Sequence, residues 1–165
     1  EVLEHSEYVN LYLLGSEKII SQEVAEELGE YGSVTRIEGE TPSQLSLSFA
    51  QFIDKETGFG WGANEPGHGL TFVSTENPEY AIAGVPFAHL GKHTPLIWLE
   101  AGELNEEMYQ YFSVIKPLYE ETPLEGPYNH NYILGSMEDV SFEAQGTIDE
   151  MLEIQSSAGA GHGSH

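Results

Sequence analysis

The chain has 165 residues, of which 28 are acidic and 5 basic, giving a formal net charge of −23, and it contains no cysteine. This length suits one domain with its own core, and the lack of cysteine excludes disulfides, thiolate metal sites and cysteine nucleophiles. The charge argues against nucleic acid and anionic membranes as partners, because both bind clustered Lys and Arg, and no apolar stretch is long enough to span a bilayer.

The first predicted strand, residues 9–14, opens a sequence repeat. Residues 12–16 return at 132–136 with the same Gly-Ser pair, and Ser21 and Glu23 return as Ser141 and Glu143. Each copy predicts a buried strand, a turn and a helix capped by a serine. We therefore expect one α/β module over residues 1–155, with its internal repeat at 9–31 and 132–154.

Helical spacing predicts that the helix after Ser21 buries an apolar stripe made of Val24, Leu28 and Tyr31. Strands are predicted at 34–37, 70–74 and 95–99, with helices at about 41–52, 80–90 and 104–115. Thr41 and Asn77, each followed by proline, are predicted N-caps, and Gly84 and Pro86 predict a kink or break in the middle helix.

The alternation of strands and helices along the whole chain indicates the fold class. Strands that are separated by helices pair in parallel through right-handed crossovers. We therefore predict an α/β fold with a parallel sheet of about five strands and helices on both faces.

Two irregular stretches, residues 57–69 and 118–130, interrupt this pattern. Phe59 and Trp61 lie between glycines in the first, and Tyr119 and Tyr128 lie near prolines in the second. Exposed aromatic residues on long loops are typical anchors of subunit interfaces, and we expect contacts with a neighbouring subunit here. The alternative is that the loops fold back and bury these rings locally. Residues 156–165 form a Gly/Ser/His tail that we expect to be flexible.

Several of these motifs together resemble the cell wall binding repeat 2 family of bacterial and archaeal surface proteins. Residues 32–39 resemble the opening of that module, 72–84 and 95–97 its middle, and 116–117 with 132–135 its closing strand. The resemblance implies a noncatalytic α/β module that is secreted, holds proteins at the cell surface, associates as trimers and engages anionic wall polymers. Residues 41–42 are Thr-Pro where the family has an Arg-Tyr pair, the two irregular stretches are insertions, and a charge of −23 opposes an anionic ligand.

The carboxyl ends of the predicted strands are candidate ligand positions, because parallel sheets bind ligands there. Ser16, Glu76, Asn77 and Ser136 lie at these ends. They predict a cleft for a small ligand or glycan, whereas turn and cap roles explain the same residues without a ligand.

Two pairs of histidines are candidate metal ligands. His89 and His93 have the spacing of a metal pair on a helix, although the sequence after His89 places His93 at or beyond the helix end. His162 and His165 lie in the tail. Apart from these, no cofactor is expected, and the open alternative is Ca²⁺ that bridges surface carboxylates of neighbouring subunits.

No serine, histidine or carboxylate falls in a nucleophile-elbow or metalloprotease pattern, so we expect no catalysis. The sequence predicts an extracellular structural protein that associates with itself as an oligomer, layer or filament, or attaches to an envelope polymer. The alternative is a soluble binding protein for a small ligand or glycan in the cleft above the strand ends.

Overall fold

The computed structural model describes residues 9–89 and 93–158, and the predictions for His162 and His165 lie outside them. The α/β class and the parallel strand pairing are confirmed. In place of one sheet of about five strands, however, the described strands form three separate sheets, with two, three and two members. No helix in these two described segments is long and apolar enough to cross a membrane.

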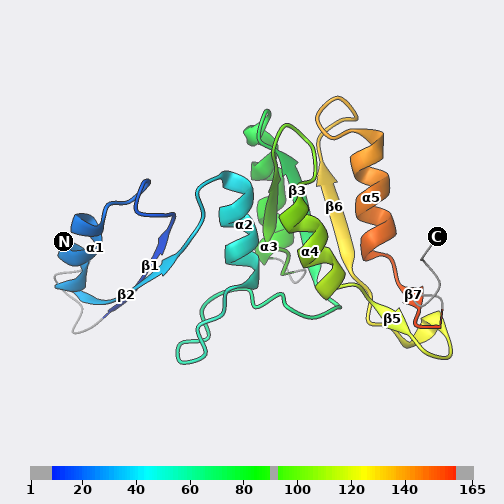
Figure 1. The fold of residues 1–165 in the computed structure, drawn as a ribbon, viewed down its shortest axis with the longest axis horizontal. Coiled ribbons are helices and arrows are strands. Elements are labelled where there is room, and N and C mark those ends of the chain that lie inside the picture. Colours follow the sequence, from blue (N-terminus) through cyan, green and yellow to red (C-terminus); the bar gives the residue numbers. More distant parts are fainter. Residues whose placement is uncertain (1–8, 90–92, 159–165) are drawn as a thin grey trace.

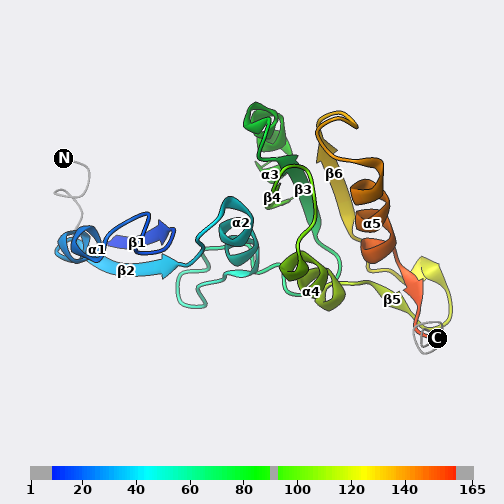
Figure 2. The same cartoon turned by 45° about the horizontal axis from the view of Figure 1, so that its top comes forward.

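The first unit, which we call the arm, consists of β1 (Val9–Leu14), α1 (Gln22–Gly29) and β2 (Gly32–Ile37). Its strands pair in parallel, from Val9 opposite Gly32 to Leu14 opposite Ile37. Position 32 requires glycine, because a Cβ there would lie 1.9 Å from the carbonyl oxygen of Val9. The predicted cap is confirmed, since Ser21 Oγ accepts the Val24 N–H at 3.4 Å. Figures 1 and 2 both show the arm extending from one end of the molecule.

Helix α2 (Pro42–Gln51) links the arm to the body and begins at the predicted cap, with Thr41 Oγ1 accepting the Gln44 N–H at 3.2 Å. On its buried side Ser46 Oγ accepts the N–H of Trp98 at 3.0 Å. That N–H belongs to the strand edge where a further strand would otherwise pair. The helix therefore blocks the sheet at this edge, and the arm strands pair only with each other.

The body contains a parallel sheet of β3 (Gly69–Ser74), β4 (Leu96–Leu99) and β6 (His130–Leu134), in the order β4-β3-β6. Every residue of the central strand β3 is buried. On one face Phe72 packs edge-on against Phe112 of α4 (Glu106–Val114), with ring centroids 5.8 Å apart. Helix α5 (Phe142–Leu152) and the buried side of α2 complete the core on this face.

The opposite face of the same sheet is covered by η2 (Pro78–Gly84) and α3 (Val85–His89), where Gly84 lies over Thr71. The predicted break in this helix is confirmed, because the 3₁₀ turns of η2 end where α3 begins. The prediction of Asn77 as a side-chain cap is wrong, since its side chain makes no hydrogen bond to the helix backbone. Helices thus cover both faces of the three-stranded sheet.

The last sheet pairs β5 (Leu118–Tyr119) with β7 (Gln155–Ser156), and η3 (Pro123–Glu125) lies between β5 and β6. It tethers the end of α5 to the irregular stretch 118–130, at the opposite end of the molecule from the arm in Figure 1.

The two copies of the sequence repeat form the same turn. Gly15 and Gly135 have φ angles of 131° and 135°, which favour glycine. After each, the carbonyl of the following serine accepts two N–H groups, those of Ile19 and Ile20 in the first copy and those of Asp139 and Val140 in the second. Equal sequence therefore gives equal local geometry at both ends of the chain.

Candidate functional site

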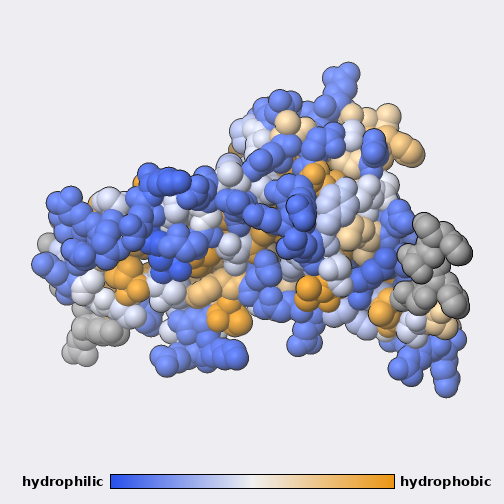
Figure 3. Space-filling model, in the orientation of Figure 1, coloured by the Kyte–Doolittle hydropathy of each residue, from blue (hydrophilic) through white to orange (hydrophobic). Residues whose placement is uncertain are grey.

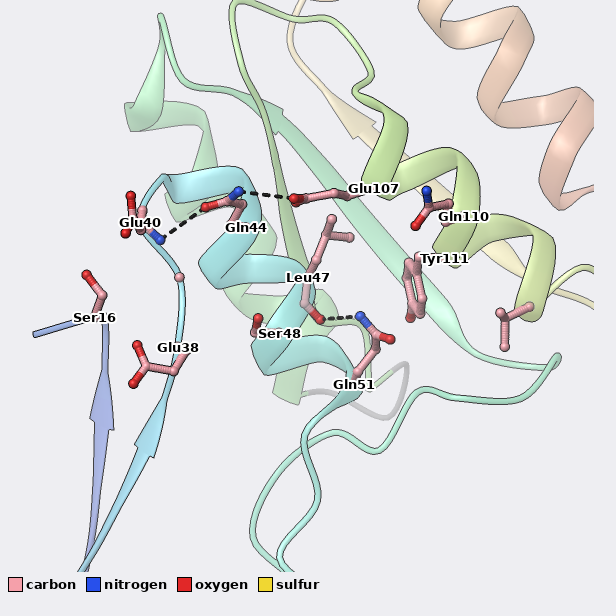
Figure 4. Close-up of a pocket in the computed structure, with 12 residues that line it drawn as sticks. Ser16, Glu38, Glu40, Gln44, Leu47, Ser48, Gln51, Glu107, Gln110 and Tyr111 are labelled. Carbon is pink, nitrogen blue, oxygen red and sulfur yellow. Dashed lines mark hydrogen bonds between the residues drawn. The ribbon is translucent and has the colours of Figure 1, made fainter.

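A cleft of about 590 Å³ lies between the tip of the arm and helices α2 and α4 (Figure 4). Amide and carboxylate side chains dominate its wall, and it is open to solvent. The lining residues are Ser16, Glu38, Gly39, Glu40, Gln44, Leu47, Ser48, Gln51, Glu107, Gln110, Tyr111 and Val114.

Backbone hydrogen bonds between the ends of β1 and β2 build the arm side of this cleft. The N–H of Gly15 donates to Ile37 O at 2.9 Å, and the N–H of Ser16 donates to Gly39 O at 3.2 Å. Arg36 Nη1 donates to the carbonyl of Gly15 at 2.9 Å, which fixes the turn from the other side. Ser16 Oγ is buried and has no hydrogen-bond partner in the described parts of the chain. It is thus a buried polar atom beside the cleft whose hydrogen-bonding capacity is unused in the described structure.

The other wall is held together by side-chain amides. Gln44 Oε1 accepts the Glu40 N–H at 3.2 Å, while Gln44 Nε2 donates to Glu107 Oε1 at 3.0 Å and so connects α2 with α4 (Figure 4). Lys18 Nζ lies 2.7 Å from Glu40 Oε1 and offsets its charge at the rim. A surface of carboxylates and amides suits hydroxyl or ammonium groups, which donate hydrogen bonds.

Tyr111 forms the floor and does not act as a proton carrier. Its hydroxyl donates to the carbonyl of Ala63 at 2.8 Å, and burial raises the pKa of Tyr111 well above its usual value. The phenol therefore stays neutral at physiological pH. Its hydrogen bond anchors the glycine-rich stretch 57–69 to α4.

The structure separates the four predicted ligand residues into two places. Ser16 lines the cleft beside the arm, whereas Glu76, Asn77 and Ser136 follow β3 and β6 in the body. The prediction of one shared cleft is wrong, because β1 does not belong to the same sheet as β3 and β6. Strand ends meet at one edge only when the strands pair in one sheet.

Asp139, which no sequence motif marks as a candidate site residue, holds together the group of residues at the ends of β3 and β6. Asp139 Oδ1 accepts Asn77 Nδ2 at 2.5 Å, and Asp139 Oδ2 accepts the N–H of Ser136 at 2.5 Å. The backbone N–H of Ser136 is the main cause that lowers the pKa of Asp139, with the Ser136 and Asn77 side chains adding to it and burial opposing it. This buried carboxylate fixes the turn after β6 to the end of β3. Its position three residues after a Gly-Ser turn was the only signal in the sequence.

The aromatic residues proposed for an interface are engaged in contacts within the chain to different degrees. Phe59 stacks on Tyr12 of β1 with ring centroids 4.0 Å apart, and Trp61 meets Phe49 of α2 edge-on at 6.5 Å. Tyr119 is half-buried in β5, and the exposed Tyr128 donates a hydrogen bond to the carbonyl of Pro123. Phe59 remains 40% exposed, so one side of its ring faces solvent.

The histidine pair does not share a helix. Helix α3 ends at His89, and His93 has a φ of 48°, in the left-handed region. Within residues 9–89 and 93–158 no group of three or more His, Cys, Asp or Glu side chains is placed to hold a metal ion.

A comparison of the chain with models of known protein families gives no match, and a comparison with curated proteins gives none either.

Proposed function

We propose that the chain is a noncatalytic protein of the cell surface that associates with copies of itself. An apolar cleft of about 350 Å³, where the arm meets α2, carries this proposal. Its lining is formed by Leu14, Ile19, Glu40, Thr41, Pro42, Leu45, Ser46 and Trp98. Leu14 is 40% exposed and Ile19 is 56% exposed, so the arm presents apolar side chains to solvent in this cleft, beside the half-buried Leu45 and Trp98 of the body.

The apolar lining of this cleft contrasts with the mostly hydrophilic surface around it. In Figure 3 hydrophobic residues form separate orange areas on a surface that is mostly hydrophilic. A strongly acidic protein disfavours unspecific contacts by charge repulsion, so an apolar hollow of this kind suits a partner of matching shape. The resemblance to the cell wall binding repeat 2 family, whose modules associate as trimers, supports a second copy as that partner.

The net charge sets the conditions for association. Copies that each carry a formal charge of −23 repel one another unless ions screen or bridge their carboxylates. Ca²⁺ binds carboxylate oxygens and can lie between two acidic surfaces. Self-association of this protein should therefore strengthen with ionic strength and with divalent cations.

The proposal is tested by static light scattering over a range of protein concentrations at about 0.15 M salt, where charges are screened beyond about 8 Å. Ile19→Glu places a charge in the apolar cleft and should lower the mass toward that of a monomer. Ile82→Glu is the matched control, because Ile82 is 75% exposed on η2, outside the cleft. A mass that both variants leave unchanged, or that both lower equally, contradicts association through this cleft.

A second candidate function rests on the polar lining of the cleft in Figure 4, beside which Ser16 Oγ is buried without a described partner. Its amides and carboxylates suit a neutral or amino sugar, which presents several hydroxyl donors. Calorimetric titration with chitin and glucan oligosaccharides tests this function. Heat of binding that Gln44→Ala abolishes would support it, and a lack of heat with every sugar would refute it.

A further inference from the structure

The two copies of the repeat share their sequence but differ in what covers them. In the second copy Val140 and Ile148 are fully buried and Ala144 is 2% exposed, because α5 packs against α4 and the sheet. In the first copy Val24, at the position of Ala144, is 42% exposed, and Ile20 and Leu28, at the positions of Val140 and Ile148, are only half-buried. Val24, Leu28 and Tyr31 line a groove of about 410 Å³ at α1, with Glu27 and Glu30 at its sides. No residue of α1 is buried. The prediction that this helix buries its apolar stripe is therefore wrong for the described structure, in which Val24 and Tyr31 are exposed and α1 lacks the cover that α5 has.

The strand edges show the same difference. In β6, His130 donates its N–H to His68 O, so the even-numbered residues of β6 face β3. At the end of β1, Gly15 donates to Ile37 O, so the odd-numbered residues face β2. Because successive residues of a strand point their N–H groups to opposite sides, Asn10, Tyr12 and Leu14 present theirs away from β2. These residues correspond to His130, Tyr132 and Leu134. The edge of β1 that no described strand pairs is thus the edge that β6 uses to join β3.

We propose that β1 and α1 are the closing strand and helix of a second module of this fold, one whose sheet ends at a strand equivalent to β3. The pairing of β3 with β6, which starts with Gly69 opposite His130, gives the register. In this register, the partner's equivalent of Gly69 lies opposite Asn10 of β1. The partner's equivalent of Val73 lies opposite Leu14 of β1. The partner also presents a helix equivalent to α4, whose Met108 and Phe112 contribute to the core that buries α5.

This interaction goes beyond the association of intact copies. In an intact copy β3 is already paired on both sides, with β4 and β6, so an intact copy offers no place for β1. The partner is a module without its own closing unit, and the arm supplies what that module lacks. Self-association through the apolar cleft can fail without affecting this inference.

The test is a fusion that offers such a module to the intact chain. Residues 38–120 are joined directly to Glu1 of the full chain, so that the arm follows at the spacing at which β6 and α5 follow in the natural sequence. The control fusion carries residues 38–165 instead, and its added module therefore keeps its own β6 and α5. Peptides from residues 9–37 occur once in each fusion, so hydrogen exchange read by mass spectrometry reports the arm alone.

The proposal predicts that exchange of the β1 and α1 amides slows by at least about 100-fold in the first fusion, relative to the lone chain, and stays unchanged in the control. Val24→Glu should remove this gain, whereas Glu23→Gln, on the neighbouring exposed position, should keep it. Unchanged exchange in the first fusion, whether or not the added segment folds, overturns the proposal. Equal protection of the arm in both fusions also overturns the proposal, because an intact copy would then cover the arm. Protection of the arm already in the lone chain overturns it as well, because another copy or residues 1–8 would then cover it.

Discussion

The hydroxyl of Tyr12 donates a hydrogen bond to Asp54 Oδ2 at 2.6 Å and joins the arm to the loop that follows α2. The ring of the same tyrosine stacks on Phe59, so one side chain provides both a polar and an apolar contact. Asp54 Oδ1 in turn accepts the N–H groups of Glu56 and Thr57. This carboxylate thus organises its own turn while it holds Tyr12.

The Tyr12 contact should be visible in the titration of Asp54. The Tyr12 hydroxyl, followed by the two backbone N–H groups, lowers the pKa of Asp54 from 3.8 to about 2. Tyr12→Phe removes the largest cause, so the pKa of Asp54 should rise toward 3.8. Carbon-detected NMR of the carboxyl group measures it directly, and an unchanged midpoint would show that the pair is not formed in solution.

The same shift sets the pH dependence of the contact. Because the folded-state pKa of Asp54 lies below the ordinary value of 3.8, ionised Asp54 stabilises the folded state above about pH 4. This contribution is lost as the pH falls through about 2. In the natural protein, protection of the β1 amides from hydrogen exchange should fall as the pH drops from about 4 to about 2. Asp54→Asn should remove this pH dependence. Glu56→Gln should keep it.

The two copies of the repeat should respond differently to the same core truncation. Ile148→Ala removes a fully buried side chain and should lower the free energy of unfolding by about 2–5 kcal/mol. Leu28→Ala, at the equivalent half-buried position of the arm, should cost about 1 kcal/mol or less. Urea denaturation followed by circular dichroism compares the two. Equal losses would mean that the arm is as well covered as α5.

Gly32 should be indispensable for the pairing of β1 with β2 in the arm, whereas the nearby Gly29 should be replaceable. A Cβ at position 32 would overlap the backbone of Val9, whereas a Cβ at position 29 meets nothing within 4 Å. Gly32→Ala should therefore separate β1 from β2 and accelerate hydrogen exchange throughout the arm. Gly29→Ala should preserve exchange or slow it slightly, because alanine restricts the unfolded chain. Normal exchange in Gly32→Ala would contradict the parallel register of β1 and β2.

The serine that blocks the sheet edge offers a further comparison. Ser46→Ala leaves the N–H of Trp98 without its partner and should cost about 1–3 kcal/mol in urea denaturation. Ser48→Ala, on the same helix, changes a half-buried side chain with no hydrogen bond to the described residues and should stay within about 0.5 kcal/mol of the natural protein. A neutral Ser46→Ala would show that α2 does not protect β4 through this bond.

Local features of the fold could be predicted from the sequence, because the residues that decide them are neighbours. The caps at Ser21, Thr41 and Ser141 and the break at Gly84 depend on contacts within one helical turn. The α/β class follows from the alternation of such elements.

Contacts between residues far apart in the chain could not be predicted from the sequence. Whether a strand joins a sheet depends on what already occupies its edge, and the bond from Trp98 to Ser46 spans 52 positions. Asn77 has the sequence context of a helix cap, yet its amide turns to Asp139, 62 positions away. Phe59 was predicted from its glycine neighbours to be an exposed anchor or a locally buried ring, and its stacking on Tyr12 of β1 could not be inferred from either pattern.

The central claim, that this acidic protein associates with itself, is tested most directly by the mass of the intact chain in solution. Sedimentation equilibrium with millimolar Ca²⁺ and again with a chelator separates the effect of cation bridging from that of apolar contact. The account predicts a mass above that of one chain that increases with protein concentration and is larger with Ca²⁺. A single-chain mass at every concentration under both conditions would contradict it.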